Sequence, residues 1–207
     1  MLTIYGRTNS ANVQKVLWCL AEIGVPYRRI DAGLEHGKNN EPWYLALNPN
    51  GRVPLLQDGA FSLWESNTIV RYLASKHAYG TLYPASPEDR ALAERWMDWQ
   101  LSTLVRPVSI VFQNLFRTPV EQRDAAAIER NIAEANRAVA LLDAHLSAQP
   151  YVAGTSFTIG DIPVGAIAHR WLEIPAIERP PLKALREWRA RLAERPGFKA
   201  HVMLPLS

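Results

Sequence analysis

The chain has 207 residues, of which 48% are hydrophobic and 21% charged, and its formal net charge is +3. Basic residues alternate with acids and no basic run reaches five, so the sequence lacks the charge pattern of a nucleic-acid-binding protein. The single cysteine, Cys19, excludes an internal disulfide and a cysteine-rich metal site. No apolar run approaches membrane-spanning length, and no signal sequence precedes Leu2. We therefore expect a cytoplasmic protein that binds neither nucleic acid nor membrane.

The first thirty residues predict a βαβ unit. Residues 2–5 form a short apolar run of strand type. Residues 13–23 carry apolar side chains at helical spacing, and Gly24 supplies a stop signal. Residues 25–30 then return to strand type, so strand, helix and strand follow within the length of one such unit. A short turn of helix is expected at 42–47.

The stretch 48–73 predicts turn, strand, turn, strand and helix. Asn48 to Gly51 are turn formers, and the apolar run 53–57 ends in Asp58-Gly59, a dipeptide that suits a two-residue hairpin. A second strand at 61–64 leads into a helix that opens at Glu65-Ser66. The order βαβ then ββα is that of a thioredoxin-like domain, which we place at residues 1–79.

The remainder of the chain predicts helices only. Residues 80–87 have the composition of a linker, and 88–207 form a predicted all-α bundle domain. The expected helices span 88–117 with a kink at Pro107, 121–147, 158–172 with a Thr158-to-Asp161 capping box, and 182–194 with a stop at Pro196-Gly197. The fold class is therefore α/β plus all-α.

Three features of the hairpin and the helix after it suit a small peptide ligand. Pro54 opens a strand, and a cis bond before it would leave the main chain of Val53 free to pair with a guest strand. Ser66 stands at a helix start, where free N–H groups and a hydroxyl bind a carboxylate. Glu65 can accept an ammonium group. The alternative is that Glu65 and Ser66 only cap the helix.

The segments Arg52-Val53-Pro54 and Glu65-Ser66 resemble the glutathione-binding half of the soluble glutathione S-transferases, in particular theta-like and bacterial branches that use a serine. The resemblance covers the whole chain, because a thioredoxin-like domain, a linker and an all-α domain is the family's architecture. It implies glutathione as co-substrate without metal or nucleotide, conjugation to a small, mostly apolar electrophile, and a homodimer. It also implies that Thr158 and Asp161 serve folding rather than chemistry.

Conjugation requires the glutathione thiolate, because a free thiol has a pKa near ~8.5 and is a poor nucleophile. The resemblance places Ser10 at the family's thiolate-activating position and Asn12 two residues on, where some bacterial branches have an asparagine facing the sulfur. Ser10 as a plain helix cap and Tyr5 as the activating group remain alternatives. Cys19 lies among apolar residues and is expected to be an inert core thiol, which disfavours exchange chemistry on a protein cysteine.

The resemblance also gives candidate residues for the glycine end of glutathione and for the acceptor site. Arg52 suits the glycine carboxylate of glutathione, and Asn39 matches a family position near it. Neighbouring alternatives in that loop are His36, Lys38 and Asn40. The candidates for the acceptor site are Ser102, Arg106, Ile110, Phe116 and Trp171.

Two other functions fit the same sequence. One is a glutathione-dependent disulfide reductase or peroxidase, in which glutathione supplies every sulfur. The other is a non-catalytic glutathione-binding or ligand-binding protein of the same fold, against which the intact Val53-Pro54 and Glu65-Ser66 pairs argue.

Overall fold

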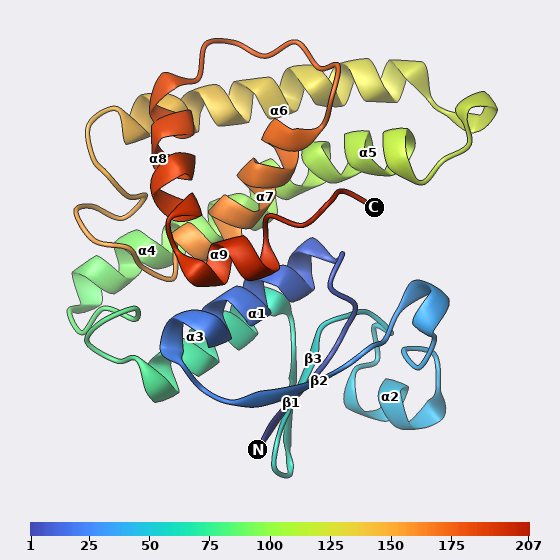
Figure 1. Ribbon diagram of the computed structural model, residues 1–207, viewed down its shortest axis with the longest axis vertical. Helices are drawn as coiled ribbons and strands as arrows, with labels where there is room; N and C mark the ends of the chain where they lie inside the picture. The colour runs from blue at the N-terminus through green and yellow to red at the C-terminus, as the bar shows by residue number, and fades with distance from the viewer.

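The computed structural model describes residues 1–207 and contains one four-stranded mixed sheet and a set of helices (Figure 1). The strands are β1 (Leu2–Tyr5), β2 (Tyr27–Ile30), β3 (Leu55–Asp58) and β4 (Phe61–Trp64), in the order β2-β1-β3-β4. The helices are α1 (Ala11–Ile23), α2 (Pro42–Leu47), α3 (Ser66–His77), α4 (Pro87–Trp99), α5 (Val105–Phe116), α6 (Ala125–Leu146), α7 (Asp161–Glu173), α8 (Lys183–Ala193) and α9 (Pro196–His201).

The sheet has the thioredoxin-like βαβ-ββα order that the sequence predicts. β1 and β2 pair in parallel, with Leu2 opposite Tyr27, and the crossover between them is α1. β1 and β3 pair antiparallel, and β3 continues into β4 through a two-residue turn whose Gly59 has a φ of 63°. Only glycine adopts that left-handed conformation at little cost, which explains the Asp-Gly signal.

Helix α1 lies between the sheet and the helical part of the chain (Figure 1). It packs against α3, α7 and α9, so side chains on nearly all of its faces are buried. The backbone of Gly165 in α7 lies against the Trp18 ring, since a Cβ atom at that glycine would fall 3.1 Å from Trp18. Trp18 also contacts Phe198 of α9 edge to face, with 4.8 Å between ring centroids. The two parts of the chain therefore share one core.

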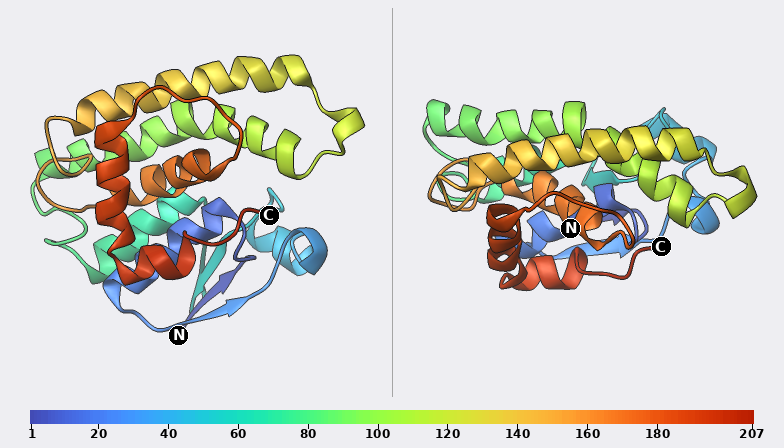
Figure 2. Two further views of the ribbon diagram at one scale, coloured as in Figure 1. Left: turned by 45° about the horizontal axis from the view of Figure 1, so that its top comes forward. Right: turned by 90° about the horizontal axis from the view of Figure 1, so that it is seen from above.

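The helices α4 to α9 form the bundle predicted for the C-terminal part, and Figure 2 shows α6 lying along its outer side. Most predicted bounds hold to within a few residues, and the division at residues 79, 80–87 and 88 stays a prediction. The helix predicted at 182–194 does end before Pro196-Gly197, since α8 ends at Ala193. The sequence analysis missed a further short helix, because Pro196 is also the first residue of α9. Proline suits that position, where no N–H is required and its φ is already helical.

The predicted kink at Pro107 appears as a wide turn just before the proline. Residues Gln100–Leu104 form a π-helical segment between α4 and α5, and α5 runs on through Pro107. Proline has no N–H to donate to the carbonyl of Thr103, four residues earlier, so the irregular turn lies where that hydrogen bond is missing. None of the helices is both long and apolar enough to span a membrane.

The start of α7 has the predicted capping box. The buried carboxylate of Asp161 accepts hydrogen bonds from the N–H of Thr158 at 2.9 Å, the N–H of Val152 at 3.0 Å and the indole of Trp188 at 3.0 Å. The Thr158 hydroxyl in turn accepts from the N–H of Gly160 at 3.3 Å. Burial raises the pKa of Asp161 to about 6, against the effect of these donors. The box ties three segments together.

Candidate active site

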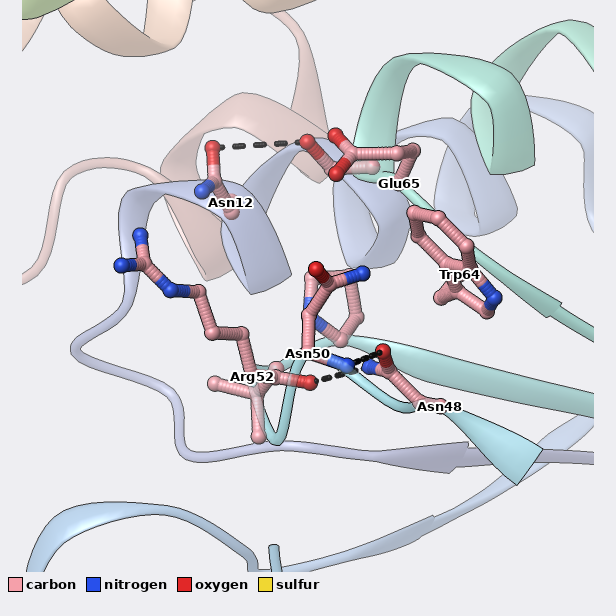
Figure 3. Close-up of a pocket in the computed structure, with 9 residues that line it drawn as sticks. Asn12, Asn48, Asn50, Arg52, Trp64 and Glu65 are labelled. Carbon is pink, nitrogen blue, oxygen red and sulfur yellow. Dashed lines mark hydrogen bonds between the residues drawn. The ribbon is translucent and has the colours of Figure 1, made fainter. Parts of the chain in front are cut away.

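A cavity of about 140 Å³ opens between the turn before β3 and the start of α3 (Figure 3). Nine residues line it, of which only two are hydrophobic: Asn12, Asn48, Asn50, Arg52, Val53, Pro54, Trp64, Glu65 and Ser66. Six of these had been assigned to glutathione or its activation from the sequence. The structure therefore brings Asn12, from the first turn of α1, together with the hairpin and helix start of residues 52–66.

The main chain at Val53 is open to a ligand. The Val53–Pro54 bond is cis, and neither the N–H nor the C=O of Val53 enters a backbone hydrogen bond within the protein. The preceding carbonyl, that of Arg52, is instead held by the Asn48 side chain and the Tyr44 hydroxyl, both at 2.7 Å. The turn is thus fixed on one side of Val53 while Val53 itself keeps a free donor and acceptor for an added strand.

Glu65 and Ser66 present opposite chemistry to the same cavity. Glu65 adopts a φ of 71°, a costly conformation for a residue with a side chain, and its carboxylate points into the cavity (Figure 3). Ser66 is the first residue of α3, where N–H groups have no helical partner. An acceptor for an ammonium group thus lies beside donors for a carboxylate.

The starts of α1 and α3 are joined by a hydrogen bond. The Ser66 hydroxyl donates to the side-chain carbonyl of Asn12 at 3.3 Å, and Figure 3 shows the Asn12 amide nitrogen on the cavity side. Ser10 is the residue that precedes α1 and is 8% exposed, and its hydroxyl makes no cap hydrogen bond. The helix-capping alternative for Ser10 is therefore wrong, and the hydroxyl remains available. Ser10 lies outside the lining of the cavity, two residues before Asn12.

Lys15 is a component of the site that the sequence reasoning missed. Its ammonium is fully buried beneath Ser66 and contacts only neutral oxygens: Gln100 at 3.0 Å, Asn67 at 3.2 Å and Ser66 at 3.4 Å. Burial lowers the pKa of Lys15 to about 7, with nearby Arg170 adding to the shift and Glu65 opposing it. The positive charge beneath the carboxylate-binding end of the cavity thus has no anionic partner in direct contact.

Neither the Tyr5 hydroxyl nor the Cys19 thiol is available for chemistry at the cavity. The Tyr5 hydroxyl donates to the Gln57 side chain at 2.7 Å, and its ring packs on Trp43. This places Tyr5 in the sheet, as core packing would require. Cys19 is fully buried, and burial raises the pKa of its thiol well above the usual range. Its environment is that of the inert core thiol expected from the sequence.

The other predicted residues lie apart from the cavity wall. Asn39 donates to the carbonyl of Gly51 at 2.7 Å and so supports the turn before Arg52 from outside. Among the acceptor candidates, Ser102 and Arg106 are exposed and Ile110 and Phe116 are half-buried. Trp171 was a wrong choice, because its ring is fully buried in the bundle core and faces no opening.

Comparison with known proteins decides the family. The model for the glutathione S-transferase N-terminal domain matches residues 1–75, and that for the C-terminal domain matches 125–201. The chain is 43% identical to glutathione S-transferase GstB of Escherichia coli K12 over 209 residues, with both chains fully covered. It is 34% identical to glutathione S-transferase 3 of Zea mays, over 97% of this chain and 93% of that one. This chain belongs to the glutathione S-transferase family.

A solved relative adds the ligand of that family. The crystal structure of the theta class glutathione S-transferase from Xanthomonas axonopodis pv. citri, with glutathione bound, has a TM-score of 0.95. It is 49% identical to this chain and covers 100% of this chain and 99% of its own. The predicted family, fold class and glutathione transferase function are thereby confirmed, while the roles of individual residues rest on the geometry above.

Proposed function

We propose that this glutathione S-transferase binds glutathione in the cavity between residues 48–54 and the start of α3, and activates its thiol at the start of α1. The observation that carries the proposal is the Ser66–Asn12 hydrogen bond of 3.3 Å, because it joins the peptide-binding helix start to the loop that carries Ser10. A ligand held along Val53 then has one end at Glu65 and Ser66 and its middle beside the first loop.

The binding chemistry follows from the lining. The Glu65 carboxylate takes the γ-glutamyl ammonium. The free N–H groups of α3, together with the Ser66 hydroxyl once its proton turns from Asn12, take the neighbouring carboxylate. The free N–H and C=O of Val53 pair with the peptide main chain. Arg52 takes the glycine carboxylate, and Asn39 contributes by holding the turn that presents Arg52.

Activation of the thiol is assigned to Ser10, assisted by Asn12. The Ser10 hydroxyl is not used for capping, so it can donate to the sulfur, and the N-terminus of α1 adds positive potential at the same place. Both effects favour the thiolate, and each unit of pKa reduction corresponds to about 1.4 kcal/mol. The thiol proton leaves to solvent, the sulfur then forms a bond to the electrophilic carbon, and the leaving group departs with its bonding electrons.

The acceptor is a small electrophile that enters from the side of α5, with Ile110 and Phe116 as apolar contacts and Ser102 and Arg106 at its exposed rim. We further propose a cytoplasmic homodimer that uses no metal or nucleotide. The alternative of a glutathione-dependent disulfide reductase or peroxidase is favoured by one observation, namely that the site has no accessible protein thiol, so that glutathione would supply every sulfur.

The test compares glutathione conjugation to 1-chloro-2,4-dinitrobenzene with reduction of a glutathione disulfide and of cumene hydroperoxide. The proposal expects conjugation to be the fastest after correction for the uncatalysed rates, and expects Ser10→Ala to reduce it. Glutathione binding in calorimetry without any of the three reactions would contradict it in favour of a binding protein.

A further inference from the structure

Three arginines from distant segments converge beside the first loop. Arg7 precedes Ser10 in that loop, Arg117 follows α5, and Arg170 lies near the end of α7. The guanidinium groups of Arg117 and Arg170 both lie against the Phe112 ring, at 5.0 and 4.4 Å from its centroid. Arg170 also donates to the main-chain carbonyl of Asn9 at 3.2 Å, next to Ser10.

No carboxylate side chain neutralises this cluster. The ion pairs of the structure include none of the three arginines. Arg7 is only 9% exposed, and its Nε has no hydrogen-bond partner, as is also true of the Nε of Arg170. Buried guanidinium nitrogens are nearly always paired, because leaving such a charge without a partner is strongly destabilising.

The electrostatics agree with the geometry. Burial, together with the charges of Arg117 and Arg7, lowers the pKa of Arg170 to about 10. Burial and Arg117 also lower the pKa of Arg7, while only the more distant Glu35 opposes the shift. The three cations therefore repel one another, and an anion between them would relieve both this repulsion and the missing hydrogen bonds.

We propose that Arg7, Arg117 and Arg170 form a subsite for the anionic group of the acceptor, a carboxylate or an equivalent oxyanion on a small aromatic electrophile. The inference rests on the proposed role of Ser10, since it places the anion beside the loop that activates the thiol. It also changes the substrate class, because the resemblance alone implies a mostly apolar electrophile.

The surroundings supply the apolar half of such a site. Phe112 and Phe116 stack with 4.9 Å between centroids, and the two guanidinium groups on Phe112 therefore lie beside an aromatic pair. Ser207 of the C-terminal tail lies beside Arg117 and the first loop, because its main-chain oxygen accepts from Arg117 at 3.0 Å and its hydroxyl accepts from Asn9 at 3.0 Å. The acceptor's anion would replace these contacts of Ser207.

The experiment uses a matched pair of electrophiles, 4-chloro-3-nitrobenzoate and 4-chloro-3-nitrobenzamide. In both, the sulfur bonds to the carbon that carries chlorine and chloride leaves with the bonding electrons. For each variant kcat/KM is divided by the second-order rate constant with free glutathione at the same pH, and the ratio of benzoate to benzamide is the readout. We expect the wild type to favour the benzoate at least tenfold.

The variants separate anion binding from anchoring of the tail. Arg117→Gln, at an exposed position where folding is not at risk, should reduce the ratio about threefold, and Arg7→Gln or Arg170→Gln about tenfold. Arg7→Lys and Arg170→Lys, which keep the charge, should restore part of it. Arg137→Gln, which removes an exposed charge on α6, should leave the ratio unchanged.

Two results would overturn the subsite. One is a wild-type ratio near one, and the other is a loss of both substrates in equal measure, which would mean that the arginines only anchor the tail. If the benzamide is also not conjugated by the wild type, the proposed transferase site fails as well, so the two proposals are distinguishable.

Discussion

The starts of helices α1 and α7 carry similar sequence signals but are used in opposite ways. At α7 the Thr158–Asp161 box is closed, because the Asp161 carboxylate accepts from two main-chain N–H groups and one indole. At α1 the preceding Ser10 has a hydroxyl of the same capping type, yet it makes no cap hydrogen bond. The start of α7 serves folding, and the start of α1 is left open for a ligand.

The difference shows how a functional helix start is recognised in a structure. A hydroxyl or carboxylate before a helix normally satisfies the free N–H groups and stabilises the fold. Where it does not, its hydrogen-bonding capacity is retained at some expense of stability, and a ligand can use it. Glu65, with a φ of 71° and its carboxylate turned into the cavity, follows the same rule at the start of α3.

Substitutions at the start of α7 should reduce stability, and substitutions at the start of α1 should reduce activity. The largest effect is expected at α7. Asp161→Ala leaves three buried donors without an acceptor, at about 1–3 kcal/mol each. We expect the free energy of unfolding to fall by at least about 3 kcal/mol in urea titrations. The matched control is Asp124→Ala at the exposed start of α6, where one bond from Ala127 at 2.8 Å is lost and about 1 kcal/mol is expected. Equal losses in the two variants would contradict the account.

Ser10→Ala should reverse that pattern. We expect kcat/KM for conjugation to fall about 100-fold, the usual loss when one hydrogen-bond donor to a developing or bound anion is removed, with the unfolding free energy changed by less than about 0.5 kcal/mol. Its control is Ser86→Ala, at the start of α4, where the hydroxyl does cap the helix by accepting from Asp89 at 3.3 Å. That variant should lose about 1 kcal/mol of stability and keep its activity. A stability loss in Ser10→Ala as large as in the control would show that the hydroxyl caps α1 in solution.

Lys15→Met tests the buried charge beneath Ser66. We expect KM for glutathione to rise about tenfold, a change of about 1.4 kcal/mol, with a smaller effect on kcat, because the ammonium acts on the carboxylate that Ser66 binds. Lys76→Met, which removes an exposed ammonium paired with Asp58, serves as the control and should leave KM unchanged. An unchanged KM in Lys15→Met would mean that Lys15 has only a structural role, connecting α1 to α3 and to Gln100.

The same variant predicts a pH dependence of stability. The pKa of Lys15 is about 7 in the folded chain and has its ordinary value near 10.5 when unfolded. Between these values the unfolded state binds more protons, so the Lys15 contribution makes the unfolding free energy rise with pH. We expect the wild type to gain stability relative to Lys15→Met from pH 7 to pH 9, by up to about 1 kcal/mol per unit. If the unfolding free energies of the wild type and Lys15→Met change with pH in parallel, Lys15 keeps its ordinary pKa in the folded chain.

The smallest effect is expected from Asn12→Ala. Its side chain accepts from Ser66 at 3.3 Å and offers its amide to the cavity, so its loss weakens one neutral hydrogen bond, at about 1 kcal/mol. We expect a change of about fivefold in kcat/KM for glutathione. A loss as large as that of Ser10→Ala would transfer the main activating role to Asn12.

The parts of the site that sequence could predict are those with a local signal. Val53-Pro54, Glu65-Ser66 and the Thr158–Asp161 box each combine a turn or cap pattern with a fixed spacing, and each lies where expected. Lys15 has no such signal, because a polar residue on an amphipathic helix normally faces solvent. Its burial depends on distant segments, because the ammonium lies against Ser66 and Asn67 of α3 and against Gln100.

The acceptor side of the site could not be predicted from the sequence, for the same reason. Arg7, Arg117 and Arg170 are separated by more than fifty residues along the chain, and the fold alone brings Arg117 and Arg170 to the Phe112 ring. Trp171 was misassigned because an aromatic residue on a bundle helix fits a groove and a core equally well by sequence. Contacts between distant segments carry this information, and spacing along one segment does not.

The central claim is that the open start of α1 stabilises the thiolate of bound glutathione through Ser10. The most direct measurement is the ultraviolet difference spectrum of bound glutathione, titrated with pH, for the wild type and Ser10→Ala. We predict a thiolate band that titrates at least about one unit below the free-thiol value near ~8.5 in the wild type, and an upward shift of that titration in the variant. Glutathione bound without a low-pH thiolate band, or a band that the substitution leaves in place, would contradict the account.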